Sequence, residues 1–285
     1  MKKLTAISPL FPTIFLELPQ PPKEVFISGN EQLLKPEQLK VAIVGSRKVS
    51  PYGREVTARL SRELAERGIT VVSGLALGVD SIAHKAALEA GGTTIAILPG
   101  SISKIYPASH TYIAKQILEK NGLLLGEYSD PQATPMKHQF IARNRLIAAI
   151  ADVVVITEAA EASGSLHTAN FALETGKTVL AVPGPITSPT STGTNNLLKN
   201  GAGIITEVGD ILLALGLDPS MEPVANSIST EEEALILTYI KKGVFDASEL
   251  LHKTGLSAQL FNQNLTMLEI TGRIRSLGNN HWALA

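Results

Sequence analysis

Residues 41–47 read Val-Ala-Ile-Val-Gly-Ser-Arg, an apolar run followed by a glycine turn that ends in an arginine. Short runs of this kind recur along the chain as far as residue 215. They cover residues 41–44, 70–72, 94–98, 123–125, 153–156, 179–182 and 204–205. Because they are apolar at almost every position, they are typical of strands buried on both faces.

Helical spacing separates these runs. Val56, Leu60 and Leu64 recur every four residues ahead of Gly68, and Ile113 and Ile117 keep the same spacing between the third and fourth runs. Strands and helices that alternate over six steps predict an α/β fold with a doubly wound parallel sheet.

Composition divides the remaining residues into three segments. Residues 1–35 are rich in proline and lack periodicity, which predicts an N-terminal lead-in packed at the edge of a sheet domain over 36–215. Residues 216–230 contain Gly216, Pro219 and Pro223 and are predicted to be a linker.

The last segment, residues 231–285, is predicted to be a small winged-helix domain. Helices are expected over 231–242, from residue 246 onward, and over 257–270. The second of these helices starts at Asp246, with Glu249 as its capping-box partner. Strands are expected to follow at 273–277 and 281–284. The segment has five Lys and Arg against six acidic residues, and none of the five lies in 257–269. Since phosphate neutralisation supplies most non-specific DNA affinity, we expect a protein-contacting or dimer-supporting module.

The overall composition excludes several classes of protein. A length of 285 residues suggests about two domains. The absence of cysteine excludes disulfides, thiolate catalysis and cysteine-bearing zinc sites. No apolar run reaches the ~18 residues of a membrane span, and the N-terminus lacks a signal-peptide pattern. We therefore expect a cytoplasmic protein with no membrane association.

The charge is nearly balanced, with 25 Lys and Arg against 26 Asp and Glu, but it is unevenly distributed. No acidic residue lies between Asp130 and Asp152, where Lys137, Arg143 and Arg145 are found. None lies between Glu174 and Glu207 either, where Lys177 and Lys199 are found. This pattern indicates one anion-binding groove on an otherwise neutral protein.

Ligands of such sheets bind beyond the carboxyl ends of the strands. After the first run, Gly45 allows close approach of the backbone, Ser46 offers a hydroxyl and Arg47 offers a phosphate ligand. After the second run, Asp80 is expected to cap a helix. After the fifth, Ser163, Gly164 and Ser165 open a helix whose N-terminus suits an anion.

Glycine is also what any tight turn needs, so a single turn of this kind indicates little. Three turns at one edge of the sheet, beside two acid-free windows, favour a binding site.

Residues 137–145 carry the most specific pattern. If they are helical, Phe140, Arg143 and Asn144 share one face, with Lys137 one turn earlier. A cation, an aromatic ring, a guanidinium and an amide are the groups that bind a single strand of nucleic acid. The alternative for Phe140 is a core aromatic. Arg145 should point elsewhere, and we expect it to pair in part with a carboxylate.

Common catalytic and cofactor motifs are missing. There is no G-x-G-x-x-G dinucleotide fingerprint, no complete P-loop and no G-x-S-x-G elbow. The histidines form no metal-binding pair, and His138 and His167 are expected to be hydrogen-bonding residues near the groove. We predict no cofactor, no metal and no catalytic residue.

Several segments together are similar to one family. Residues 41–47, 72–82, 140–148 (FIARNRLIA), 163–169 (SGSLHTA), 181–184 (AVPG) and 193–195 strongly resemble the DNA-processing protein A (DprA, also called Smf) family over residues 20–215, and residues 231–285 resemble its C-terminal winged helix. The resemblance implies an extended Rossmann-like fold and a non-enzymatic, dimeric binder of single-stranded DNA. It also implies that the protein protects incoming strands and loads the RecA recombinase during natural transformation.

The resemblance also implies the nucleic-acid-binding residues. These are Gly45, Ser46, Arg47, Lys137, Phe140, Arg143, Asn144, Arg145, Ser163, Gly164 and Ser165. Leu77 departs from the family, which usually has an arginine there, and the helical N-terminal domain of many members is not seen.

Two other functions are compatible with the pattern. A phosphoribohydrolase of the lysine-decarboxylase-like type has a similar sheet and similar glycine turns, but its PGGxGTxxE signature corresponds here to residues 163–169, which lack the paired glycines and an acid. A scaffold that recruits partners through the winged helix is the third possibility.

Overall fold

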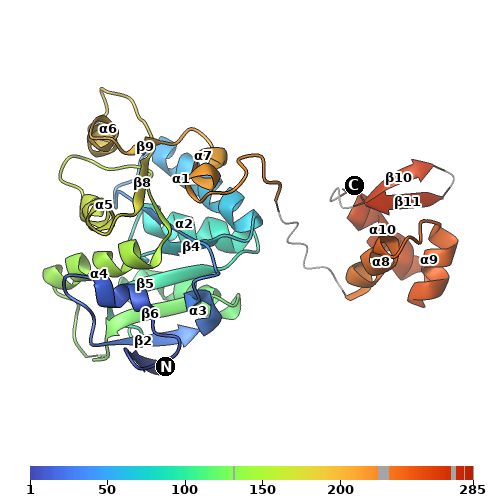
Figure 1. Cartoon of the computed structure of the whole chain (residues 1–285), viewed down its shortest axis with the longest axis horizontal. Coiled ribbons are helices and arrows are strands. Elements are labelled where there is room, and N and C mark those ends of the chain that lie inside the picture. The colour runs from blue at the N-terminus through green and yellow to red at the C-terminus, as the bar shows by residue number, and fades with distance from the viewer. Residues whose placement is uncertain (131, 224–230, 271–273, 279, 285) are drawn as a thin grey trace. The chain divides into compact units, whose positions relative to one another are not determined.

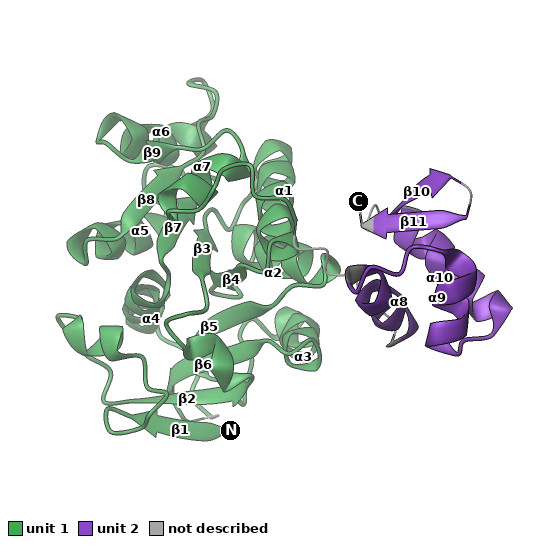
Figure 2. Cartoon of the chain, turned by 45° about the vertical axis from the view of Figure 1, so that its right-hand side comes forward, with its two compact units in different colours: residues 1–224 green, residues 225–285 purple. Residues whose placement is uncertain are grey.

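The protein is described by a computed structural model that covers residues 1–130, 132–223, 231–270, 274–278 and 280–284. It divides into two compact units, residues 1–224 and 225–285 (Figure 2). The predicted linker residues 224–230 and the predicted helix stop at 271–272 lie outside the described residues.

The first unit is built on a nine-stranded sheet with the order β1-β2-β6-β5-β4-β3-β7-β8-β9 (Figures 1 and 2). Its parallel part comprises β3 (Lys40–Val44), β4 (Thr70–Ser73), β5 (Thr94–Ser101), β6 (Leu123–Tyr128), β7 (Val153–Ile156), β8 (Thr178–Ala181) and β9 (Gly203–Ile204). The predicted α/β fold with a doubly wound parallel sheet is confirmed.

The chain order reverses in the middle of this sheet. The chain proceeds outward from β3 through β4 and β5 to β6, and then returns to place β7 on the other side of β3. Such a switch point leaves a crevice beyond the carboxyl ends of the two strands. The loops after β3 and β7 therefore meet there.

Alternating side chains on β3 explain why both faces of the sheet are covered. Ala42 and Val44 pack with α4 (Lys137–Ile150) and α5 (Ser165–Glu174). Val41 and Ile43 pack on the opposite face with α1 (Pro51–Glu66), α2 (Val79–Glu89) and α7 (Val208–Ala214). Helix α3 (Thr111–Glu119) covers β5 and β6, and α6 (Thr192–Lys199) follows β8.

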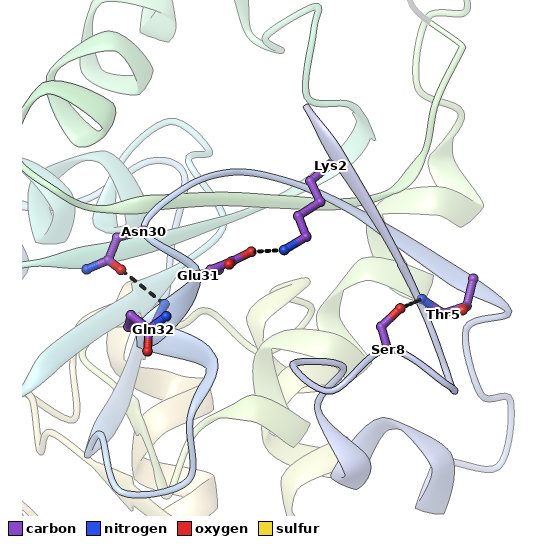
Figure 3. A network of polar contacts seen from close by, with 6 residues as sticks. All are labelled: Lys2, Thr5, Ser8, Asn30, Glu31 and Gln32. Carbon is purple, nitrogen blue, oxygen red and sulfur yellow. Dashed lines mark hydrogen bonds and ion pairs between the residues drawn. The ribbon is translucent and has the colours of Figure 1, made fainter.

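The first 35 residues are part of the sheet rather than only a lead-in. β2 (Glu24–Gly29) pairs antiparallel with β6, and β1 (Lys2–Thr5) pairs antiparallel with β2. The helical turns η1 (Thr13–Glu17) and η2 (Glu31–Leu34) complete the segment, and an ion pair of 2.5 Å between Lys2 Nζ and Glu31 Oε2 joins β1 to η2 (Figure 3). Val25 and Ile27 are buried, which accounts for the strand.

The second unit contains α8 (Glu231–Lys241), α9 (Ala247–Thr254), α10 (Ala258–Ile270) and a hairpin of β10 (Ile274–Gly278) and β11 (His281–Leu284). Asp246 caps α9 by accepting a hydrogen bond from the Glu249 N–H, and Gly255 ends that helix with a positive φ of 66°. The core includes Ile236, Leu250 and Phe261. The order of elements matches the prediction, while the winged-helix identity stays a prediction.

Within the described part of the chain, no helix has the length and the apolar character that crossing a bilayer requires.

Candidate functional site

A pocket of about 860 Å³ lies at the switch point between β3 and β7. It is lined by the loops that follow these two strands and by one face of α4. Ten of the eleven predicted site residues line it: Gly45, Ser46, Arg47, Lys137, Phe140, Arg143, Asn144, Ser163, Gly164 and Ser165. Arg145 is absent from the lining. The strand exits and the 137–145 segment therefore converge as their spacing predicts.

The loop after β3 has a fixed shape because it is held at several points. A Cβ on Gly45 would lie 2.7 Å from the Glu158 carbonyl oxygen, so only glycine fits. The Ser46 N–H donates to that same oxygen at 2.8 Å, and its hydroxyl bonds the backbone of Lys48. Arg47, between them, is exposed.

Arg47 and Phe140 are in contact in the pocket. The guanidinium of Arg47 lies 5.1 Å from the centre of the Phe140 ring, a cation–π geometry. Tyr106 packs edge-on against the same ring at 5.6 Å. Lys137 is exposed one helical turn before Phe140. Two cations thus flank an aromatic pair that has not been absorbed into the core.

Arg143 is predicted to contact the nucleic-acid strand directly, but the structure places it deeper in the pocket. Its side chain is buried, and Nη1 donates to the carbonyls of Gly74, at 2.6 Å, and Ile97. Burial lowers the pKa of Arg143 to about 10, so it stays charged at neutral pH. Arg143 thus forms the floor of the pocket, because α4 packs against the sheet on the side where its side chain emerges.

Asp80 also differs from its predicted role as a helix cap. The N-cap of α2 is Gly78, and the Asp80 carboxylate instead accepts hydrogen bonds from the N–H groups of Gly74 and Ala76. Burial raises the pKa of Asp80, while the charge of Arg143 acts in the opposite direction. Asp80 therefore holds the β4–α2 turn beneath the pocket.

Arg145 pairs with a carboxylate, as expected. Its Nη2 lies 2.5 Å from Glu127 Oε2, and both side chains are largely buried. It lies two residues from Arg143 on a different side of α4 and outside the pocket lining, where it joins α4 to β6; its contact with nucleic acid stays a prediction.

The loop after β7 presents the N-terminus of α5 to the pocket. Gly164 is the N-cap and is exposed, with no side-chain capping bond, and a Cβ there would meet nothing within 4 Å. The hydroxyls of Ser163 and Ser165 are 2.8 Å apart, and the Asn144 amide donates to the Gly164 carbonyl at 3.2 Å. Asn144 thus ties α4 to this helix end.

Sequence reasoning missed several lining residues, among them Lys48, Tyr106 and Thr190. Lys48 follows Arg47 directly, and Tyr106 and Thr190 come from the loops after β5 and β8. Their spacing carried no signal, because only the fold brings these loops together. His167 lines the pocket and His138 does not.

The pocket has a positive character. Arg47, Lys48, Lys137 and Arg143 line it, and among the described lining residues the one carboxylate is Asp80, which is buried close to Arg143. No group of three or more His, Asp or Glu suited to a metal occurs among the described residues. The site therefore suits a ligand that carries several negative charges and an aromatic group able to stack on a ring.

Comparison with known proteins agrees with this chemistry. The family model described as DNA recombination-mediator protein A matches residues 2–216. Protein Smf of Escherichia coli K12 is 41% identical over 209 residues, which are 73% of this chain and 55% of that protein. The chain thus spans about half the length of this relative.

Two solved structures are also similar. The X-ray structure of DNA processing protein A (DprA) from Streptococcus pneumoniae has a TM-score of 0.69 and 36% identity, and the match covers 74% of this chain and 73% of that one. DNA processing protein A from Helicobacter pylori, described for its single-stranded DNA binding mode, has a TM-score of 0.65 and 39% identity over 75% of this chain and 96% of that one. None of these three carries an enzyme name.

Proposed function

The chain belongs to the DNA recombination-mediator protein A family, and from that premise we propose that it binds single-stranded DNA in the pocket at the β3–β7 switch point. The observation that carries the proposal is the joint exposure of Arg47 and Lys137 around the Phe140 ring. Cations that follow a sugar-phosphate backbone and a ring that stacks a base are the two parts of single-strand recognition.

The Helicobacter pylori relative supports this proposal, because it is described for its single-stranded DNA binding mode and the match with the present chain covers nearly all of that relative's chain. The phosphoribohydrolase alternative gains no support. The segment corresponding to its signature opens α5 with Gly164 as the N-cap, and the next acidic residue, Glu174, is the last residue of that helix. No acid from this segment is therefore placed for glycosidic chemistry at the open end.

The finer role follows from the same premise. We propose that the protein protects incoming single strands and loads RecA on them in natural transformation, as a homodimer in the cytoplasm. We also propose that residues 231–285 form a winged-helix module that contacts protein, because α10 lacks the cations that docking on DNA requires.

Titration of a labelled oligothymidine over a series of salt concentrations tests the binding. Affinity should fall steeply with salt, and Arg47→Ala should weaken it and reduce the salt dependence by about 0.7 in log K against log salt, the contribution of one phosphate contact on a single strand. Arg62→Ala is the matched control, since Arg62 is exposed on α1 outside the pocket lining. Absent or salt-independent binding would contradict the proposal.

The base contact has its own test. Phe140→Leu keeps apolar volume but removes the ring, and we expect a loss of about 1–3 kcal/mol on a normal strand. On an abasic strand the same variant should bind like the wild type, whereas Arg47→Ala should still bind more weakly. Equal losses on both strands would show that Phe140 supports the pocket rather than a base.

A further inference from the structure

Glu158 is a buried carboxylate that the proposed binding does not use. It follows β7 and is 2% exposed. Its Oε2 accepts hydrogen bonds from the Ser50 N–H at 3.1 Å and from the Ser50 hydroxyl at 2.8 Å. Among the ion pairs of the described residues, none involves Glu158. A buried charge needs compensation, and here the donors all belong to the start of α1.

The carboxylate lies directly against the first turn of that helix. A Cβ on Gly53 would be 1.7 Å from Glu158 Oε2, so the glycine leaves the space that the carboxylate fills. The Gly53 N–H donates to the Ser50 hydroxyl, which in turn donates to Glu158. Pro51 has no N–H, and the Arg54 N–H is taken by the Ser50 carbonyl. The N–H groups of Gly53 and Arg54 are thus both bonded within the protein.

In open α/β sheets, the N-terminus of a helix at the switch point commonly binds a phosphate of the ligand. At α1 a carboxylate of the protein occupies that position. A ligand phosphate is therefore excluded from α1 and directed to Arg47, Lys137 and the exposed N-terminus of α5.

Glu158 also holds both ends of the loop that carries Arg47. Its backbone carbonyl accepts the Ser46 N–H at 2.8 Å, and its side chain accepts the Ser50 N–H and hydroxyl. Arg47 and Lys48 lie between these two attachments. The loop after β3 is thus fixed to β7, across the switch point.

We infer that Glu158 is a positioning residue, an internal anion that closes the α1 N-terminus and sets the place of Arg47 in the pocket. The inference rests on the proposed function for its effect on DNA, but the occupation of the helix end is independent of it. Removing the carboxylate should leave a space, lined by the donors of Ser50, that fits a small carboxylate such as formate.

The first test is anion rescue without DNA. Glu158→Ala should unfold at a lower temperature than the wild type, and formate should raise its midpoint more than chloride at equal ionic strength. The wild type and Glu161→Ala, which removes an exposed acid three residues away, should respond equally to both salts. If the variant does not fold alone, refolding yield with and without formate gives the same comparison. A missing formate effect overturns the inference.

The second test measures oligonucleotide affinity at a temperature where every variant is folded. Glu158→Ala should bind roughly tenfold more weakly, equivalent to about 1.4 kcal/mol, and formate should restore the affinity. Arg47→Ala should cost much less in the Glu158→Ala background than in the wild type, because the arginine is already misplaced. Additive losses would overturn the positioning role. If the wild type binds no oligonucleotide, the proposed function fails while formate rescue still decides on Glu158.

Discussion

The pocket has a rim, formed by the exposed Arg47, Lys48 and Lys137 and the half-buried Phe140, and a buried floor, formed by Asp80 and Arg143. Each contains an arginine that the sequence marks as a phosphate ligand. The rim arginine lies over an aromatic ring, while the floor arginine donates to the carbonyls of Gly74, after β4, and Ile97, in β5. A charge at the rim is therefore available to a ligand, whereas a charge in the floor holds the loops and acts on a ligand through its field.

The largest expected difference between rim and floor is in stability. Arg143→Leu removes a donor from the carbonyls of Gly74 and Ile97 and leaves Asp80 buried without its compensating charge. We expect a loss of about 3–5 kcal/mol in the free energy of unfolding by urea. Arg47→Leu should stay within about 0.5 kcal/mol of the wild type and lose DNA affinity instead. Similar stability losses for the two variants would remove the distinction between rim and floor.

This distinction marks the limit of what the sequence could predict. Continuous apolar runs located β3 to β9, and helical spacing placed Lys137, Phe140 and Asn144 on one lining face. Spacing alone did not separate Arg143 from that face, because burial depends on how α4 packs on the sheet. The sequence around Asp80 favours a helix cap, whereas its carboxylate accepts hydrogen bonds from the N–H groups of Gly74 and Ala76, which precede the helix.

Contacts distant in sequence account for the other differences. The hydrogen bonds between Glu158 and Ser50 join residues 108 apart, and no local pattern indicates them. The sequence did not indicate β1 and β2, because prolines dominate the segment that connects them, although Val25, Phe26 and Ile27 form a short apolar run that is buried in the structure.

A pair of glycines sharpens the comparison next. At Gly53 an added methyl group would collide with the Glu158 carboxylate, and we expect Gly53→Ala to cost about 2–3 kcal/mol although alanine ordinarily favours a helix. At Gly164, on the open end of α5, the same change meets nothing within 4 Å and should cost about 0.5 kcal/mol or less. Thermal or urea unfolding of the two variants measures both, and equal effects would contradict the assignment of a closed and an open helix end.

The stability of the protein should also depend on pH through the buried His84. His84 is fully buried, its Nδ1 bonds the Thr94 hydroxyl, and burial lowers its pKa from 6.5 to about 3. Below pH 6.5 the unfolded chain binds a proton that the folded protein rejects, so this contribution to stability is complete above pH 6.5 and is lost as the pH falls toward 3. At pH 5 the loss is about 2 kcal/mol.

The raised pKa of Asp80 acts in the opposite sense in the acidic range, because there the folded state holds the proton more tightly. The measurement is therefore a difference. The free energy of unfolding is compared at pH 7 and pH 5 for the wild type and for His84→Gln, which keeps a side chain able to bond Thr94 but does not titrate. The wild type should lose about 2 kcal/mol more than the variant; parallel losses would mean that His84 is protonated in the folded state.

The smallest expected effect belongs to the rim. Lys137→Gln removes one exposed cation and no packing, so stability should not change, and the salt dependence of oligonucleotide binding should decrease by about 0.7 in log K against log salt. Lys115→Gln is the matched control, since Lys115 is also exposed and lies on α3 outside the pocket lining. If the bound oligonucleotide does not pass through the pocket, Lys137→Gln and Lys115→Gln should change the salt dependence equally. A reduced slope for Lys137 alone would place a phosphate at the first turn of α4, one turn from the ring on which we propose that a base stacks.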